Sequence, residues 1–117
     1  MRENLVQQKS FSFALLIIEL YKKLIERKEY VLSRQILKSG TSIGANIEES
    51  IGAQSRNDFI SKISIAYKEA RETEYWLKLL FGGKYITQKE FNFYLLEVST
   101  ILKLLTAIQK TTKSKIE

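Results

Sequence analysis

The chain has 117 residues, of which 44% are hydrophobic and 27% charged, and its formal net charge is +6. Domains commonly have about 100–150 residues, so this length predicts one domain, residues 1–117, and the composition is far from that of a disordered chain. The sequence contains no Cys and no His, which excludes disulfides, thiolate metal sites, cysteine nucleophiles and the usual general base near neutral pH. A chain without cysteine suits the cytoplasm.

The first predicted helix covers residues 10–28. Its apolar face repeats at spacings of three and four residues, as an amphipathic helix requires: Phe13, Ile17, Leu20 and Leu24. Further apolar residues widen this face, so the helix contacts two neighbours or contributes to a subunit interface. The uncharged apolar run 13–18 is far shorter than the roughly 20 residues that span a bilayer, and no membrane contact is predicted.

The second predicted helix covers residues 30–51 and has two glycines, Gly40 and Gly44, near its middle. A glycine inside a helix costs about 1 kcal/mol relative to alanine. Close approach of another helix backbone at these positions would offset that cost. The alternative is a loop at residues 39–41 that splits the segment.

The third predicted helix covers residues 55–81. It begins at Ser55, with Asp58 three residues later as the acidic partner of a capping box. Gly82 and Gly83 end it, as glycine does at helix C-termini. Thr73 interrupts an otherwise apolar face.

The fourth predicted helix covers residues 87–111 and has the clearest start signal. Thr87 at the N-cap and Glu90 three residues later form a second capping box. The apolar positions that follow have the spacing of a bundle seam. The polar tail after Ile108 is expected to fray.

Four amphipathic helices joined by short turns predict an all-α fold, an antiparallel up-down-up-down four-helix bundle. No segment shows the alternation of a strand.

Carboxylates are the only candidates for catalysis. Glu69 and Glu72 lie three residues apart, but di-iron bundles also need histidines, which this chain lacks. Lys68 is four residues from Glu72, a spacing typical of a solvated, ion-paired face. Ser39 beside Lys38 does not form a nucleophile–base pair, because adjacent helical residues point in different directions. We therefore predict no catalytic residue, no metal site and no cofactor.

Two groups of basic residues favour nucleic acid, RNA or DNA, as a partner. One group ends the first helix and the other lies at the C-terminal end of the chain: Lys22, Lys23, Arg27 and Lys28, then Lys103, Lys110, Lys113 and Lys115. Such side chains neutralise phosphates. The alternative is that lysines near helix C-termini favour the helix dipole and solubility.

Aromatic residues are the second feature. Tyr75 and Trp76, and the cluster Phe91, Phe93 and Tyr94, cannot all face one core. An outward ring stacks on an unpaired base or anchors a subunit interface.

Two stretches of this sequence, residues 35–49 and residues 65–77, are similar to the bacterial four-helix-bundle family also called the 23S rRNA intervening-sequence protein or S23 family. The most specific parts are Ser-Ile-Gly-Ala-Asn-Ile-x-Glu, residues 42–49, and Glu-Thr-Glu-Tyr-Trp-Leu, residues 72–77. The family motif falls on Ser42, Asn46, Glu49, Glu72 and Leu77.

This resemblance implies a cytoplasmic bacterial bundle that assembles into a ring-shaped homopentamer. We expect the motif to be structural, with Asn46 and Glu49 pairing with polar groups of the third helix and fixing its register. The predicted function is a non-enzymatic, RNA- or ribosome-associated binding module. The alternative is a ring-shaped scaffold that docks a partner protein, with the basic charge serving only solubility.

Overall fold

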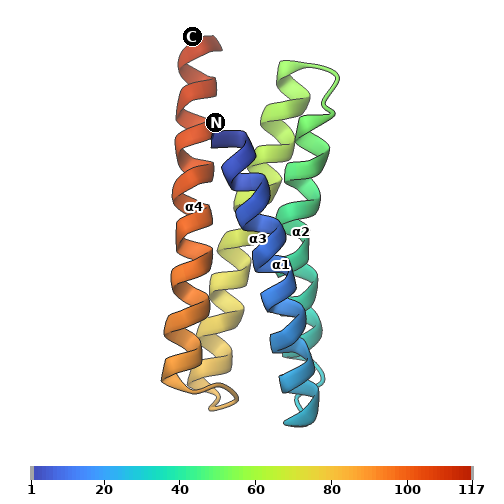
Figure 1. The fold of residues 1–117 in the computed structure, drawn as a ribbon, viewed down its shortest axis with the longest axis vertical. Coiled ribbons are helices and arrows are strands. Elements are labelled where there is room, and N and C mark those ends of the chain that lie inside the picture. Colours follow the sequence, from blue (N-terminus) through green and yellow to red (C-terminus); the bar gives the residue numbers. More distant parts are fainter. Residues whose placement is uncertain (1, 117) are drawn as a thin grey trace.

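The computed structural model describes the backbone of residues 2–116 and the side chains of residues 5–112. Within the described backbone there is no strand. Figure 1 shows that successive helices run in opposite directions, as predicted for an up-down-up-down bundle. The helices are α1 Arg2–Glu26, α2 Leu32–Ile51, α3 Arg56–Gly82 and α4 Gln88–Ile116.

Two helices are longer than predicted. α1 begins at Arg2 and not near residue 10, because Val6 is buried on the same face as the rest of its apolar residues. α4 continues to Ile116 although fraying was expected after Ile108, and Ile108 itself is buried in the core. At the start of α1, tertiary packing therefore stabilises a turn whose own sequence is a weak helix signal.

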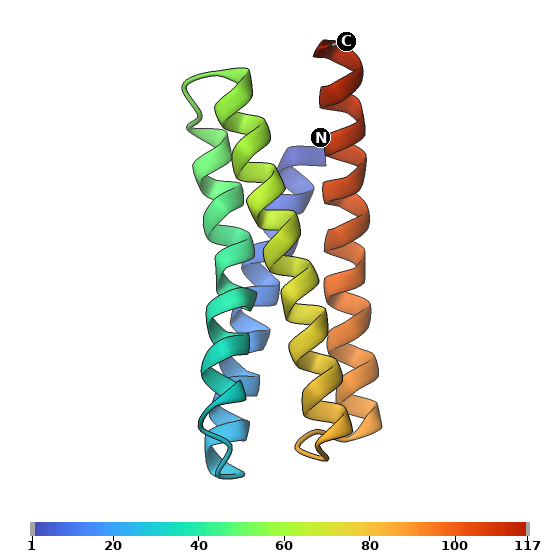
Figure 2. The same ribbon diagram turned by 180° about the vertical axis from the view of Figure 1, so that it is seen from behind.

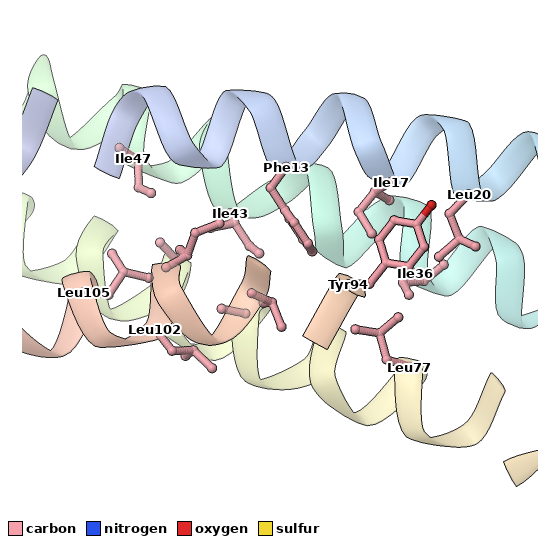
Figure 3. Close-up of a cluster of buried hydrophobic side chains, with 14 of the residues drawn as sticks. Phe13, Ile17, Leu20, Ile36, Ile43, Ile47, Leu77, Tyr94, Leu102 and Leu105 are labelled. Atoms are coloured by element: carbon pink, nitrogen blue, oxygen red, sulfur yellow. The ribbon is translucent and has the colours of Figure 1, made fainter. Parts of the chain in front are cut away.

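All four helices contribute to one core (Figure 3). Each helix contacts its two neighbours around the bundle, and the contact between α1 and α4 is the least extensive. The view from behind in Figure 2 shows α3 lying between α2 and α4, which places α1 on the other side of the bundle. The largest fully buried side chains include Phe13, Ile17, Leu20, Ile36, Ile43, Leu77 and Leu105.

Gly40 and Gly44 lie where α1 packs against α2, and the helix is continuous through both. A Cβ atom on Gly40 would lie 2.8 Å from Cγ1 of Ile17, and one on Gly44 would lie 3.4 Å from the carbonyl oxygen of Ser10. The predicted close approach is confirmed, and the alternative of a loop at residues 39–41 is excluded. At Gly40, however, the neighbour is a branched side chain and not a backbone.

The predicted capping box at Thr87 is present, whereas at Ser55 only one half forms, because Asp58 Oδ2 accepts from the Gln54 nitrogen at 3.3 Å and not from that of Ser55. The backbone nitrogen of Asp58 donates to the hydroxyl of Ser55 at 3.0 Å. At the start of α4 the backbone nitrogen of Glu90 donates to Thr87 Oγ1 at 3.1 Å, and the Thr87 nitrogen donates to Glu90 Oε1 at 2.9 Å. These bonds satisfy amide groups that a helix start would otherwise leave unpaired.

A buried polar link joins α2 and α3. The hydroxyls of Ser39 and Thr73 lie 2.8 Å apart and share a hydrogen bond, and both residues are almost fully buried. Thr73 interrupts the apolar face of α3 because it pairs with this serine. An interface that contains one buried polar pair favours a single register.

α4 is an apolar helix. By length and composition alone, residues 88–112 would suffice to cross a membrane. Tyr94, Val98 and Leu105, however, are buried against the other helices of the bundle. A core helix of a bundle passes the same test of length and composition.

Candidate nucleic-acid interface

One end of the bundle gathers most of the net positive charge. The α1–α2 and α3–α4 connections both lie at this end, at the bottom of Figure 1. Residues 22–34 and 78–90 contain eight basic and three acidic residues, a formal charge of +5 out of the chain's +6. We call the basic members of these segments the basic end: Lys22, Lys23, Arg27, Lys28, Arg34, Lys78, Lys84 and Lys89.

Two of the three acidic residues in these segments are engaged within the protein. Glu29 is buried, and its Oε1 accepts a hydrogen bond from the backbone nitrogen of Ser33 at 2.7 Å. Glu90 is paired with Arg27. Only Glu26 is exposed, so little negative charge on this surface opposes the lysines.

Arg27 and Glu90 join the two connections. The guanidinium donates to both carboxylate oxygens of Glu90, at 3.0 and 2.9 Å, and to the carbonyl oxygen of Tyr85 at 2.9 Å. Hydrogen bonding to Arg27 and to Thr87 lowers the pKa of Glu90 to about 2. Arg27 was predicted to bind nucleic acid; its guanidinium already makes three hydrogen bonds within the bundle, to Glu90 and Tyr85, and its contact with nucleic acid stays a prediction.

Lys28 and Lys84 end α1 and α3 in the same way. Each has a positive φ, 64° and 67°, in the left-handed region that glycine and asparagine favour. The nitrogen of Lys28 donates to Ile25 O, and that of Lys84 donates to Phe81 O. The residue after each lysine donates to the carbonyl five residues earlier, Glu29 N to Leu24 O and Tyr85 N to Leu80 O, which completes a Schellman motif in both helices.

Gly82 and Gly83 were expected to end α3 by their conformation. α3 does end at Gly82, but no glycine of the chain has a positive φ, and Lys84 occupies the left-handed position. The structure therefore places a lysine at both sites where a glycine would be less strained.

The two predicted basic groups are not brought together. Lys22, Lys23 and Lys28 belong to the basic end, whereas Lys103 and Lys110 lie farther along α4 toward the opposite end (Figure 1). The longest extent of the molecule is 47 Å. Lys113 and Lys115 lie outside the described side chains.

Four members of the basic end were missed from the sequence: Arg34, Lys78, Lys84 and Lys89. They are scattered singly along the chain, so no local run of charge marks them. The signal that identifies them is topological, because an antiparallel bundle places its first and third connections at the same end.

The motif residues belong to α2 and α3. The hydroxyl of Ser42 donates to Lys38 O at 2.6 Å, and the amide of Asn46 donates to Ser42 O at 2.9 Å. Both of these bonds stay within α2, unlike the pairing with the third helix expected for Asn46. Glu49 does reach α3, with its Oε1 3.0 Å from Lys62 Nζ. Glu72 is exposed and Leu77 is buried in the core.

The carboxylates of α3 do not gather into a metal site. Burial raises the pKa of Glu69, nearby Glu72 raises it further, and Lys38 lowers it. Among the side chains that the structure describes, no group of three acidic, His or Cys residues is placed to hold a metal ion.

Comparison with known proteins identifies the family. A family model described as "23S rRNA-intervening sequence protein" matches residues 2–107. The chain belongs to this family. A similar solved structure is a protein of unknown function from the S23 ribosomal protein family of Bacteroides thetaiotaomicron VPI-5482. It is 54% identical, the match covers 94% of this chain and 99% of that chain, and the TM-score is 0.93. No curated protein matches.

Proposed function

We propose that this member of the 23S rRNA-intervening sequence protein family is a cytoplasmic RNA-binding module that acts by binding and not by catalysis. The basic end supplies the phosphate contacts. The observation that carries this proposal is the concentration of eight basic residues around two connections whose acidic neighbours are mostly engaged internally. Phosphate contacts by such lysines release counterions and give strongly salt-dependent affinity.

The Schellman lysines support this role. A left-handed lysine is less favourable than glycine or asparagine at the same position, and Lys28 and Lys84 both occupy such positions at one end of the bundle. Backbone conformations that cost free energy tend to cluster where function requires a particular side chain.

Self-association into a ring, as the family resemblance implies, would multiply these contacts. Phe11 and Leu15 lie one turn apart on α1 and are 65% and 51% exposed. Beside them, between α1 and α2, is a mostly apolar notch of about 150 Å³ lined in part by Ala14 and Ala45. Adjacent exposed apolar side chains of this kind favour a subunit interface. Several basic ends on one RNA would then act together through effective concentration. Light scattering on the purified protein tests this self-association, and the mass of a monomer would contradict the proposed ring.

The test of RNA binding compares two doubly substituted proteins that lose the same charge. K28N/K84N neutralises the two connections, and asparagine suits their left-handed backbone. K103Q/K110Q is the matched control on α4, where glutamine suits the helix. We expect K28N/K84N to bind a labelled RNA hairpin at least about tenfold more weakly, and the slope of log affinity against log salt to fall by about 2.

The control should bind within about threefold of the original chain. Equal losses in both variants would show that only net charge matters and that the basic end is no interface. Affinity that is insensitive to salt would exclude phosphate contact altogether and favour the alternative, a scaffold that docks a protein.

A further inference from the structure

A groove between α1 and α4 begins at the basic end and has the features of a nucleotide site. Its volume is about 320 Å³, and three residues of α1 and four of α4 line it. It lies along the helix pair with the least extensive contact in the bundle. Small-ligand sites typically start at about 300 Å³, whereas the apolar hollow between α3 and α4 measures only about 70 Å³.

The charges of the groove favour a phosphate. Lys23 and Lys89 line it together with Glu19 and Glu90. Both carboxylates have cation partners, since Glu90 binds Arg27 and Glu19 lies 3.3 Å from Lys22 Nζ. Lys23 and Lys89 are exposed and have no ion-pair partner among residues 5–112. Two cations are therefore available to an anionic ligand.

The aromatic side chains of the groove favour a base. Phe93 is 48% exposed and packs edge-to-face with Tyr94, with ring centroids 5.1 Å apart. Figure 3 shows the Tyr94 ring directed from α4 toward α1. Tyr94 is almost fully buried. The groove thus contains an exposed ring that a base can stack on.

We propose that this groove holds one unpaired nucleotide of an RNA bound at the basic end. The base stacks on Phe93, and the flanking phosphates contact Lys23 and Lys89. An exposed aromatic ring between cations is the arrangement by which proteins hold single-stranded nucleic acid. This inference rests on the proposed function, because Lys23 and Lys89 are also members of the basic end, and it adds a requirement for an unpaired nucleotide.

The test uses Phe93→Leu, which keeps an apolar side chain and removes the stacking ring. Tyr75→Leu is the matched control, because Tyr75 is a 55% exposed aromatic on α3 outside the groove. Two RNA probes share one stem: a hairpin with unpaired loop nucleotides and a blunt duplex. F93L should weaken hairpin binding about tenfold and leave duplex binding within about twofold. Y75L should change neither, and thermal unfolding verifies that both variants fold.

The outcomes separate this inference from the proposed function. If F93L binds both probes as the original chain does while K28N/K84N binds them weakly, the groove is no nucleotide site and RNA binding stands. If F93L folds normally and weakens both probes equally, the contact is not to an unpaired nucleotide and the inference is overturned. If the original chain binds neither probe, the proposed function fails as well.

Discussion

The ion pair between Arg27 and Glu90 is expected to stabilise the bundle in a pH-dependent way, and Glu90→Gln measures this. Glutamine keeps an oxygen that can accept the hydrogen bond from the Thr87 nitrogen, 2.9 Å away in the original chain. It removes the negative charge that meets the guanidinium and replaces Oε2, which accepts from Arg27, by an amide nitrogen that cannot accept. The substitution therefore isolates the ion pair from the capping box.

The magnitude follows from the pKa of Glu90, which lies at about 2 instead of 4.5. A difference of this size corresponds to at most about 3.4 kcal/mol of stability at neutral pH. The side chain of Arg27 is 37% exposed and that of Glu90 17%, so solvent screens the pair. We expect E90Q to lose about 1–2 kcal/mol in its free energy of unfolding.

The sign of the pH dependence is fixed by the direction of the shift. The pKa of Glu90 is lower in the folded chain than in the unfolded chain, so the unfolded chain takes up the proton first as the pH falls. The stabilisation is complete above the unfolded value of 4.5 and is lost as the pH falls toward about 2. The difference between the original chain and E90Q should therefore disappear over this range.

The assay is urea unfolding followed by far-UV circular dichroism, at neutral pH and in steps down to about pH 2. Glu26→Gln is the control, because Glu26 lies at the same end and is exposed; it should change stability by no more than about 0.5 kcal/mol. A difference between E90Q and the original chain that stays constant at every pH would refute the electrostatic reasoning and leave only a packing effect.

Two more predictions concern the interfaces of α2. Gly40→Ala should destabilise by about 2 kcal/mol, because its Cβ meets buried Ile17 at 2.8 Å, while Gly44→Ala should be neutral or stabilising by up to about 1 kcal/mol. Equal urea midpoints for the two variants would contradict the inference that only Gly40 lacks room for a Cβ atom. Thr73→Val should cost about 1–2 kcal/mol, because it leaves the buried hydroxyl of Ser39 with only a weaker partner; an unchanged midpoint would show that the link contributes nothing.

The sequence by itself determined the elements of the bundle. Apolar residues at spacings of three and four define the helices, and the pairs Ser55–Asp58 and Thr87–Glu90 locate two helix starts to within a residue. These signals are local, because a capping bond joins residues three apart and a helical face repeats every three or four. The start of α1 was misplaced because Val6 is held in the helix by residues distant in sequence.

Only the tertiary structure decided where the charge lies and which charges are available. Lys28 and Lys84 are 56 positions apart in the sequence. Both lie at the same end of the bundle because the helices alternate in direction (Figure 1). No local sequence signal distinguishes Arg27 from other surface cations, and only the fold places Glu90 beside it. Phosphate binding depends on distances between side chains in space, and a linear pattern specifies those distances only within a few residues.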